Sequence, residues 1–305
     1  MHKLSKKAFA RLLLLFTVIV WGATFVLVKS ALADVTPLLF NLLRMALATL
    51  ALAVINFRDL RRIGKHHLRA GAIIGLFLAA GYEFQTLGLA RTSSTNSAFI
   101  TGLVVVFVPV LASFPILRSS ETPAPSAVTG LSAIFAFLGL VLLTTPAGIS
   151  ANHLLASIGA GDILTLVCAL AFAAHLLTVA RFAKGVPAGL LATLQVGACT
   201  LFMLAALPAE HSHINLSARL TLSLIVCSLL ATAAAFTIQS FAQQSLPPTH
   251  TVLLLALEPV FAALTGLLFY HQSLSSRSLL GAALIMFAIV VVELTSNQKT
   301  AEIPT

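Results

Sequence analysis

Ten long apolar runs, separated by short basic, polar or proline-containing segments, constrain the fold of this chain more than any other feature. A helix needs about 20 mainly apolar residues to cross a bilayer. A membrane β-barrel would instead show segments of about ten residues with alternating polarity. The sequence therefore predicts an all-α membrane protein with ten transmembrane helices, at residues 9–31, 37–57, 70–90, 95–117, 126–145, 161–180, 187–207, 220–241, 249–270 and 278–294.

The composition excludes a soluble enzyme. The chain is 59% apolar and only 9% charged, whereas soluble domains are about 45–50% apolar and about 25% charged. The net charge of +9 could suggest nucleic acid as a partner, but the basic residues cluster between the apolar runs and form no patch with interleaved aromatics. We therefore expect the lipid bilayer, and not nucleic acid, as the partner. The three cysteines have no C-x-x-C spacing and are expected to be small core residues.

The distribution of basic residues predicts the orientation. The N-terminal Lys3, Lys6, Lys7 and Arg11 resemble the charged region of a signal peptide, but the apolar run continues without a clear cleavage site, so we expect an uncleaved first helix. With the N-terminus in the cytoplasm, 13 of the 18 Lys and Arg lie on the inner side and 4 on the outer side. The segments 1–8 and 295–305 are then cytoplasmic tails. The basic loop 58–69 is interpreted as a topology anchor in preference to a metal or lipid site.

The two halves of the chain share a pattern of sequence landmarks in the same order. The matches are Pro37 with Pro187, Gln85-Thr86 with Gln239-Ser240, and Gly130 with Gly281, at separations of 150, 154 and 151 residues. Each half has five spans, an odd number, so the second half must be inverted relative to the first. The sequence thus predicts two inverted five-helix repeats, at 9–145 and 161–294, an arrangement typical of secondary transporters.

Several short motifs in these halves resemble the EamA-type branch of the drug/metabolite transporter superfamily. They are Trp21-Gly22-Ala23-Thr24-Phe25, the segment 92–99 (TSSTNSAF), Val106-Phe107-Val108-Pro109, Gly161-Asp162-Ile163-Leu164 and the segment 257–264 (LEPVFAAL). The resemblance covers residues 12–294. It implies a multi-pass carrier of the bacterial-type inner membrane, with helices one to four and six to nine around a central cavity and helices five and ten at the periphery. It also implies small organic substrates such as amino acids, metabolites or drugs, moved by export.

One departure from the family pattern follows the ninth span. The family often carries Gly-Glu there, and this chain has His271-Gln272. Glu121, at the comparable place in the first half, does fit the pattern. A role for a carboxylate after the ninth span is therefore not expected.

Three charged residues lie inside predicted spans, where each charge costs about 2.5–3.5 kcal/mol on insertion scales. Arg44 and Glu83 lie at equal depth on consecutive helices, which predicts an Arg44–Glu83 pair, in transport or as a scaffold. Glu258 lies nine residues into the ninth span, and Pro259 must perturb the helix there. That combination suits a proton or cation relay, or alternatively a hydrogen-bonded structural glutamate.

Uncharged polar and aromatic residues indicate where a substrate cavity would lie. Trp21, Thr24 and Phe25 share one face of the first helix, as an aromatic platform or as simple packing. Serine and threonine stripes are interpreted mainly as contacts between helices, and Gly71 and Gly75 as close helix packing in preference to a dimer face. The other substrate-cavity candidates are Tyr82, Gln85, Asn96, His175, Gln195, Gln239 and His250.

No motif for an enzyme, a cofactor or ATP is present. Ser132 with His175 as base would suggest an intramembrane protease but lacks an orienting acid. The loop residues Glu210, His211 and His213 could form a loose metal site but are interpreted as a solvated loop. The sequence favours a secondary transporter working by alternating access, with energy from gradients or by facilitated diffusion without an energy source. The alternatives are a non-transporting membrane scaffold or an intramembrane enzyme.

Overall fold

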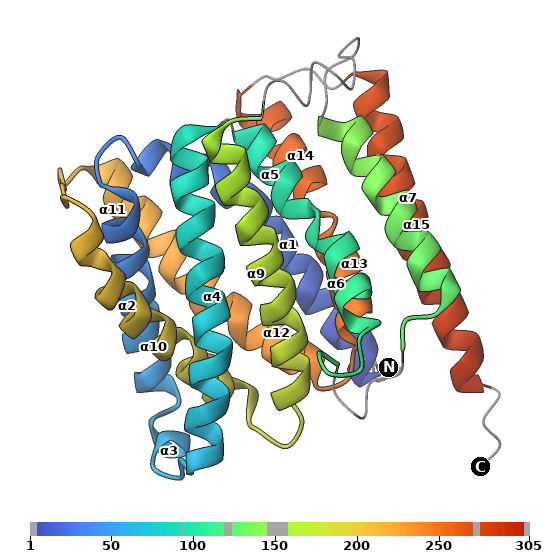
Figure 1. Cartoon of the computed structure of the whole chain (residues 1–305), viewed down its shortest axis with the longest axis horizontal. Helices are drawn as coiled ribbons and strands as arrows, with labels where there is room; N and C mark the ends of the chain where they lie inside the picture. The colour runs from blue at the N-terminus through green and yellow to red at the C-terminus, as the bar shows by residue number, and fades with distance from the viewer. Residues whose placement is uncertain (1–4, 93, 119–123, 145–157, 271–274, 302–305) are drawn as a thin grey trace.

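The computed structural model describes residues 5–92, 94–118, 124–144, 158–270 and 275–301, and this part of the chain is helical apart from one isolated β-bridge between Val35 and Ile214 (Figure 1). The first half contains α1 (Lys6–Ala31), α2 (Pro37–Ile55), α3 (Phe57–Leu60), α4 (Lys65–Arg91), α5 (Ser94–Gly102), α6 (Val104–Ala112) and α7 (Ala127–Thr144). The second half contains α9 (Ala160–Phe182), α10 (Ala188–Ala206), η1 (Leu207–Ala209), α11 (Ala218–Ile225), η2 (Val226–Ala234), α12 (Ala235–Gln243), α13 (Pro248–Leu255), α14 (Glu258–Tyr270) and α15 (Ser276–Ala301).

These helices account for the ten predicted spans. Seven helical segments of the described chain are long and apolar enough to cross a membrane. Three shorter apolar helices, Ser97–Ala112, Ala127–Leu143 and Ser276–Val292, correspond to the fourth, fifth and tenth predicted spans. The prediction of an all-α membrane protein with ten transmembrane helices is confirmed.

Local chemistry sets where the first two helices begin. The Ser5 side chain accepts a hydrogen bond from the Ala8 N–H and so caps α1. Pro37 occupies the first position of α2, where its missing N–H leaves no helical hydrogen bond unmade. Both starts are thus readable from the sequence, at Ser5 and at Pro37.

The two halves run in opposite directions and pack with a matching pattern. Figure 1 shows α1 starting at the end of the bundle where both termini lie, and α9 starting at the opposite end. In one direction, α4 packs on α9, and the equivalent contact is that of η2 and α12 on α1. Likewise, α14 packs on α1, and the equivalent contact is that of α6 on α9. The equivalent helices α2 and α10 pack on each other, as do α7 and α15 at the periphery. This pattern is the one that an inverted five-helix repeat produces.

The G-x-x-x-G of the third span brings α4 close to α10. A Cβ atom built on Gly71 would lie 2.6 Å from the Cβ of Leu194. One built on Gly75 would lie 2.6 Å from the Cβ of Ala198 and 2.7 Å from the backbone oxygen of Gln195. Only glycine allows this approach, so the prediction of close helix packing is confirmed.

A polar cluster joins the two halves at the end of the bundle away from the termini. Asp34, in the connection after α1, forms a 2.8 Å ion pair with Arg219 and accepts a 2.6 Å hydrogen bond from the Ser217 hydroxyl. Together Ser217 and Arg219 hold the pKa of Asp34 below its usual value of 3.8. The cluster ties the loop between α1 and α2 to the start of α11.

Glu210, in the loop between the seventh and eighth predicted spans, caps a helix of the other half. Its two carboxylate oxygens accept hydrogen bonds of 3.3 Å from the backbone N–H groups of Leu38 and Leu39 in the first turn of α2. Within the described residues, no group of three or more His, Cys, Asp or Glu side chains is placed to hold a metal ion. The carboxylate is therefore engaged with the α2 terminus, and His211 and His213 form no metal cluster with it.

Candidate functional site

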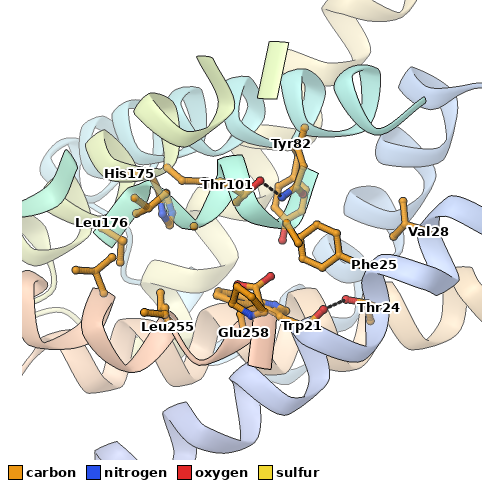
Figure 2. Close-up of a pocket in the computed structure, with 18 of the residues that line it drawn as sticks. Trp21, Thr24, Phe25, Val28, Tyr82, Thr101, His175, Leu176, Leu255 and Glu258 are labelled. Carbon is orange, nitrogen blue, oxygen red and sulfur yellow. Dashed lines mark hydrogen bonds between the residues drawn. The ribbon is translucent and has the colours of Figure 1, made fainter. Parts of the chain in front are cut away.

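A cavity of about 930 Å³, counting its open mouth, lies between the two halves (Figure 2). Its walls come from α1, α4, α5, α6 and a side chain of α2 in the first half, and from α9, α12, α13 and α14 in the second. Nine of the thirteen predicted site residues line it: Trp21, Thr24, Phe25, Arg44, Tyr82, Gln85, His175, Gln239 and Glu258.

The other four predicted residues do not line the cavity in the described structure. Gln195 lies behind the wall, hydrogen-bonded to His175, which lines it. Glu83 is hydrogen-bonded to Asn41, which does not line the cavity. His250 lies in the first turn of α13, at the end of the bundle where the termini lie. The side chain of Asn96 lies outside the described residues, as do His271, Gln272 and Glu121.

The residues that line the cavity lie toward one end of the bundle. On α1 and α4 these residues belong to the C-terminal halves, which lie away from the two termini (Figure 1). Toward the end with the termini, buried apolar side chains fill the space between the helices. These are, among others, Leu14, Val18, Val108, Leu177 and Leu253.

Two broken helices, one from each half, meet at the cavity. The fourth span divides at Leu103 between α5 and α6, and the ninth at residues 256–257 between α13 and α14. Pro259 contributes to the second break because it cannot donate to the Leu255 carbonyl and its ring would clash with that oxygen. Leu103 and Leu257 are 154 residues apart, the separation that also relates Gln85 to Gln239. The breaks are therefore equivalent positions of the repeat.

Arg44 is a buried cation in the cavity wall. Its side chain is 3% exposed and has only neutral partners. Nε donates to the Thr232 hydroxyl at 3.0 Å, Nη2 donates to the Tyr82 hydroxyl at 3.3 Å, and the guanidinium lies 4.4 Å from the Tyr82 ring centre. Among the described residues no carboxylate lies within ion-pair distance of Arg44.

The predicted Arg44–Glu83 pair does not form. Glu83 and Tyr82 are consecutive residues, so their side chains point about 100° apart on α4. Tyr82 faces Arg44, and Glu83 instead accepts a 3.0 Å hydrogen bond from the Asn41 side chain. Its other carboxylate oxygen is buried without a hydrogen-bond partner. Equal depth on adjacent helices was the correct part of the prediction, and the face of the helix was the wrong part.

Aromatic rings form the deep wall of the cavity around Phe236. Its ring centre lies 5.7 Å from that of Trp21, 6.1 Å from that of Tyr82 and 5.6 Å from that of His175. Phe172 packs edge-on against Tyr82 at 5.3 Å. Phe172 and Phe236 are not among the site residues predicted from the sequence. Each precedes a polar candidate by three residues, His175 and Gln239 respectively, and this helical spacing was the available signal.

His175 belongs to a buried chain of neutral polar groups. Its Nε2 lies 2.8 Å from the Gln195 amide oxygen, and the Gln195 amide nitrogen donates to the Ser240 hydroxyl at 3.0 Å. Gln239, one residue before Ser240, lines the cavity with an amide oxygen that has no hydrogen-bond partner among the described residues. Ser132 lies on α7, outside the cavity lining, so the described residues do not form the Ser132–His175 arrangement that the sequence already disfavoured.

A π-helical segment, η2, interrupts the eighth span where the sequence predicts one continuous helix. The Thr232 hydroxyl donates to the carbonyl of Cys227, five residues earlier, at 2.7 Å. Trp21 Nε1 donates to the Ala231 carbonyl at 2.8 Å. Segments of this kind occur often at functional sites. Here the segment anchors both Trp21 and Arg44, which lie on the first two helices.

Figure 2 shows how the labelled cavity residues face one another. Glu258 and Trp21 lie along one wall, Tyr82 and Thr101 along the opposite wall, and Phe25 projects between them. Thr101 accepts a 3.4 Å hydrogen bond from the Gln85 amide. A solute between these walls would meet a cation, a carboxylate, amides and aromatic rings.

Two inverted membrane-spanning halves around a polar and aromatic cavity define a multi-pass membrane transporter. The chain belongs to the EamA-like transporter family, whose model matches residues 8–145 and 159–294. The resemblance noted in the sequence, to this family of the drug/metabolite transporter superfamily, is therefore confirmed. The family is one of transporters and not of enzymes.

Relatives along nearly the whole chain carry the same general description. An uncharacterized transporter of Archaeoglobus fulgidus is 30% identical over 295 residues, which cover 95% of this chain and 87% of the relative. The uncharacterized transporter YvbV of Bacillus subtilis is 29% identical and covers 96% of this chain and 94% of the relative. A solved crystal structure has a TM-score of 0.72 at 18% identity, covering 95% of this chain and 98% of the other. That likeness supports the fold alone.

Proposed function

We propose that this EamA-like transporter is a secondary carrier that moves small organic solutes by alternating access. The observation that carries this proposal is the cavity where two equivalent broken helices, one from each inverted half, meet. Secondary transporters bind their substrates at such a place, between the repeats and near the bilayer midplane. An open cavity with polar walls argues against a packed scaffold without transport.

The proposed orientation has both termini in the cytoplasm of a bacterial-type inner membrane, with export as the direction. Positive residues concentrate at the end of the bundle with the termini, in agreement with the positive-inside rule. The cavity would then face outward, and the apolar cluster around Leu14, Val108 and Leu253 would close the cytoplasmic side. Transport requires this apolar cluster to separate.

The substrate that fits this cavity carries a carboxylate group and an apolar body, as amino acids and many metabolites do. Arg44 is buried and permanently charged, and its protein partners Thr232 and Tyr82 are neutral. A cation inside the membrane without a counter-ion is costly. A substrate carboxylate would supply that counter-ion, and a guanidinium binds it in a geometrically specific, bidentate manner. The rings of Trp21 and Phe236 would hold the apolar part.

Glu258 is the proposed site of proton or cation coupling. It is the first residue of α14, at the break in the ninth span, and its side chain lines the cavity. In that position the Glu258 carboxylate can exchange a proton or a cation with solvent in the cavity while it stays within the membrane. Uptake measured against imposed pH gradients tests this role: Glu258→Gln should abolish the dependence on the gradient. Equal responses of the variant and the wild type would leave Glu258 with a structural role only.

A growth screen tests the substrate class. Cells that overexpress the chain are exposed to toxic amino-acid analogues and to the amides of the same compounds, which lack the carboxylate. We expect resistance to the acids and not to the amides. Arg44→Gln should lose that resistance, whereas Arg91→Gln should keep it, because Arg91 is exposed at the end of α4 and bonds only to its own helix.

Two further measurements distinguish loss of the carboxylate contact from loss of the protein and from absence of transport. Membrane levels of each variant are compared, so that loss of protein is not mistaken for loss of transport. Trp21 is the only tryptophan and lines the cavity, so its emission in purified protein should respond to the acid that confers resistance. Resistance to acids and amides alike, or full activity of Arg44→Gln, would refute the carboxylate contact. The absence of any solute-dependent resistance or emission change would count against transport itself.

A further inference from the structure

A second hollow, the α4–α9 groove, lies away from the central cavity at the end of the bundle where the termini lie. It has an empty volume of about 1010 Å³. One face of α4 and one face of α9 form two of its sides, and the end of α6 with the residues that follow it forms the third. The helices α4 and α9 run side by side along this face of the molecule in Figure 1. None of the residues proposed to contact the substrate lines this groove, and Leu177 of the apolar cluster lies in its wall.

One end of the groove is basic. His66 and Arg69 lie in the first two turns of α4, and Arg181 lies in the last turn of α9. The Arg181 guanidinium makes a long 3.5 Å contact with the Ile116 carbonyl, and the His66 ring packs edge-on against Phe182. No aspartate or glutamate lines the groove in the described chain. The Arg69 and Arg181 guanidinium groups are therefore available to an anion, and the His66 ring lines the same end of the groove.

The remainder of the groove is apolar. Ile73 and Phe77 continue the α4 face beyond Arg69, and Leu177 and Leu111 lie across from them. Eight residues separate Arg69 from Phe77, which corresponds to about 12 Å along the helix. An apolar slot of this length, with a cationic mouth at the membrane surface, matches the shape and polarity of a phospholipid.

We propose that the α4–α9 groove binds an anionic glycerophospholipid. Its phosphate headgroup lies against His66, Arg69 and Arg181, and an acyl chain lies along Ile73 and Phe77. The basic end lies on the side with most of the positive loop residues, where anionic lipid headgroups attract Lys and Arg. The loop 58–69 thus contributes a specific lipid contact at its C-terminal end in addition to setting topology. A neutral lipid would leave Arg69 and Arg181 without a counter-ion.

The test compares two lipids with identical chains and different charge. The purified full-length chain is titrated in detergent with dioleoylphosphatidylglycerol or dioleoylphosphatidylcholine, and native mass spectrometry measures the bound lipid. We expect wild type to bind the anionic lipid more tightly. Each basic residue near an anionic headgroup contributes a factor of about five in affinity, so Arg69→Gln with Arg181→Gln should weaken that binding roughly 25-fold.

A matched control separates a site from diffuse surface charge. Arg58 and Arg62 are exposed at the same end of the bundle but do not line the groove. The double variant Arg58→Gln, Arg62→Gln removes the same charge and should keep the preference for phosphatidylglycerol. A third variant, Ala174→Phe, fills the apolar slot and should weaken binding of both lipids. Thermal unfolding without added lipid verifies that each variant is folded.

Three results would overturn the proposal. The first is equal binding of the two lipids by wild type. The second is an equal loss of preference in the two double-arginine variants, which would assign the effect to the whole basic surface. The third is undiminished lipid binding by a folded Ala174→Phe variant, because the acyl chain would then lie elsewhere. Transport activity enters none of these measurements, so they stand apart from the proposed function.

Discussion

Replacing Gly75 by alanine should destabilise the protein, whereas the same change at Gly130 should not. The Cβ at position 75 would approach the Ala198 Cβ to 2.6 Å, when ordinary contact begins at 3.4 Å, an overlap of about 0.8 Å. The neighbouring Gln195 oxygen and Cys199 nitrogen belong to the α10 backbone, so a rotamer change cannot relieve the clash. The helix itself must move.

The magnitude follows from two opposing effects. Overpacking of this kind costs about 1–3 kcal/mol, and alanine in a helix interior is favoured over glycine by roughly 0.5–1 kcal/mol. At Gly130 nothing lies within 4 Å of the added Cβ, so only the favourable effect remains. The Gly75→Ala variant should therefore be less stable than Gly130→Ala by about 1–3 kcal/mol.

Thermal unfolding of the two variants in the same detergent, followed by the emission of Trp21, provides the measurement. A difference of this size should place the unfolding midpoint of Gly75→Ala about 2–10 °C below that of Gly130→Ala. If Gly75→Ala unfolds at the same temperature as Gly130→Ala or above it, the close α4–α10 contact does not exist as described. If both variants keep the oligomeric state of the wild type, Gly75 acts in helix packing within the chain and not at a dimer interface.

Two further predictions concern the loops. Ser217 and Arg219 lower the pKa of Asp34 in the folded chain. The contribution of this cluster to the free energy of unfolding is therefore fully present above the pKa of Asp34 in the unfolded chain, near 3.8, and is lost as the pH falls through the lower pKa of the folded chain. Asp34→Asn should reduce the loss of thermal stability between about pH 6 and about pH 2, and an unchanged acid profile would contradict this. The three native cysteines are buried, so a membrane-impermeant maleimide applied to intact cells should leave the wild type unlabelled. Ser212→Cys should be labelled from outside and Arg62→Cys only after permeabilisation, and the reverse pattern would refute the proposed orientation.

The sequence predicted the cavity more completely than it predicted the contacts inside it. Polar and aromatic residues such as Gln85, Gln239 and Trp21 stand out against apolar spans, because exposing them to lipid is costly. Their partners do not stand out. Thr232 and Phe236 are ordinary residues of a membrane helix, and only the packing of η2 against α1 and α2 gives them a role.

The broken helices illustrate the same limit. Pro259 predicted a perturbation of the ninth span, because a proline cannot donate the helical hydrogen bond. The break at Leu103 lies six residues before Pro109, which itself is inside α6. The local signal at the break is Gly102, the last residue of α5, and a single glycine does not by itself predict where a membrane helix ends. The break at Leu103 is visible only in the tertiary structure, where it lies at the position equivalent to the break in the ninth span.

The amino-acid sequence by itself determined that the chain lies in a lipid bilayer, how many spans it has, that its halves form an inverted repeat, and to which family it belongs. Those properties depend on hydrophobic length, charge sign and the order of short motifs, which are local or additive along the chain. The tertiary structure decided which buried charges have partners. Arg44 and Glu83 lie at equal depth, yet the 100° turn between consecutive helical residues places Tyr82 and not Glu83 against Arg44. Partner choice inside a membrane depends on helix rotation, and helix rotation is set by packing among distant segments.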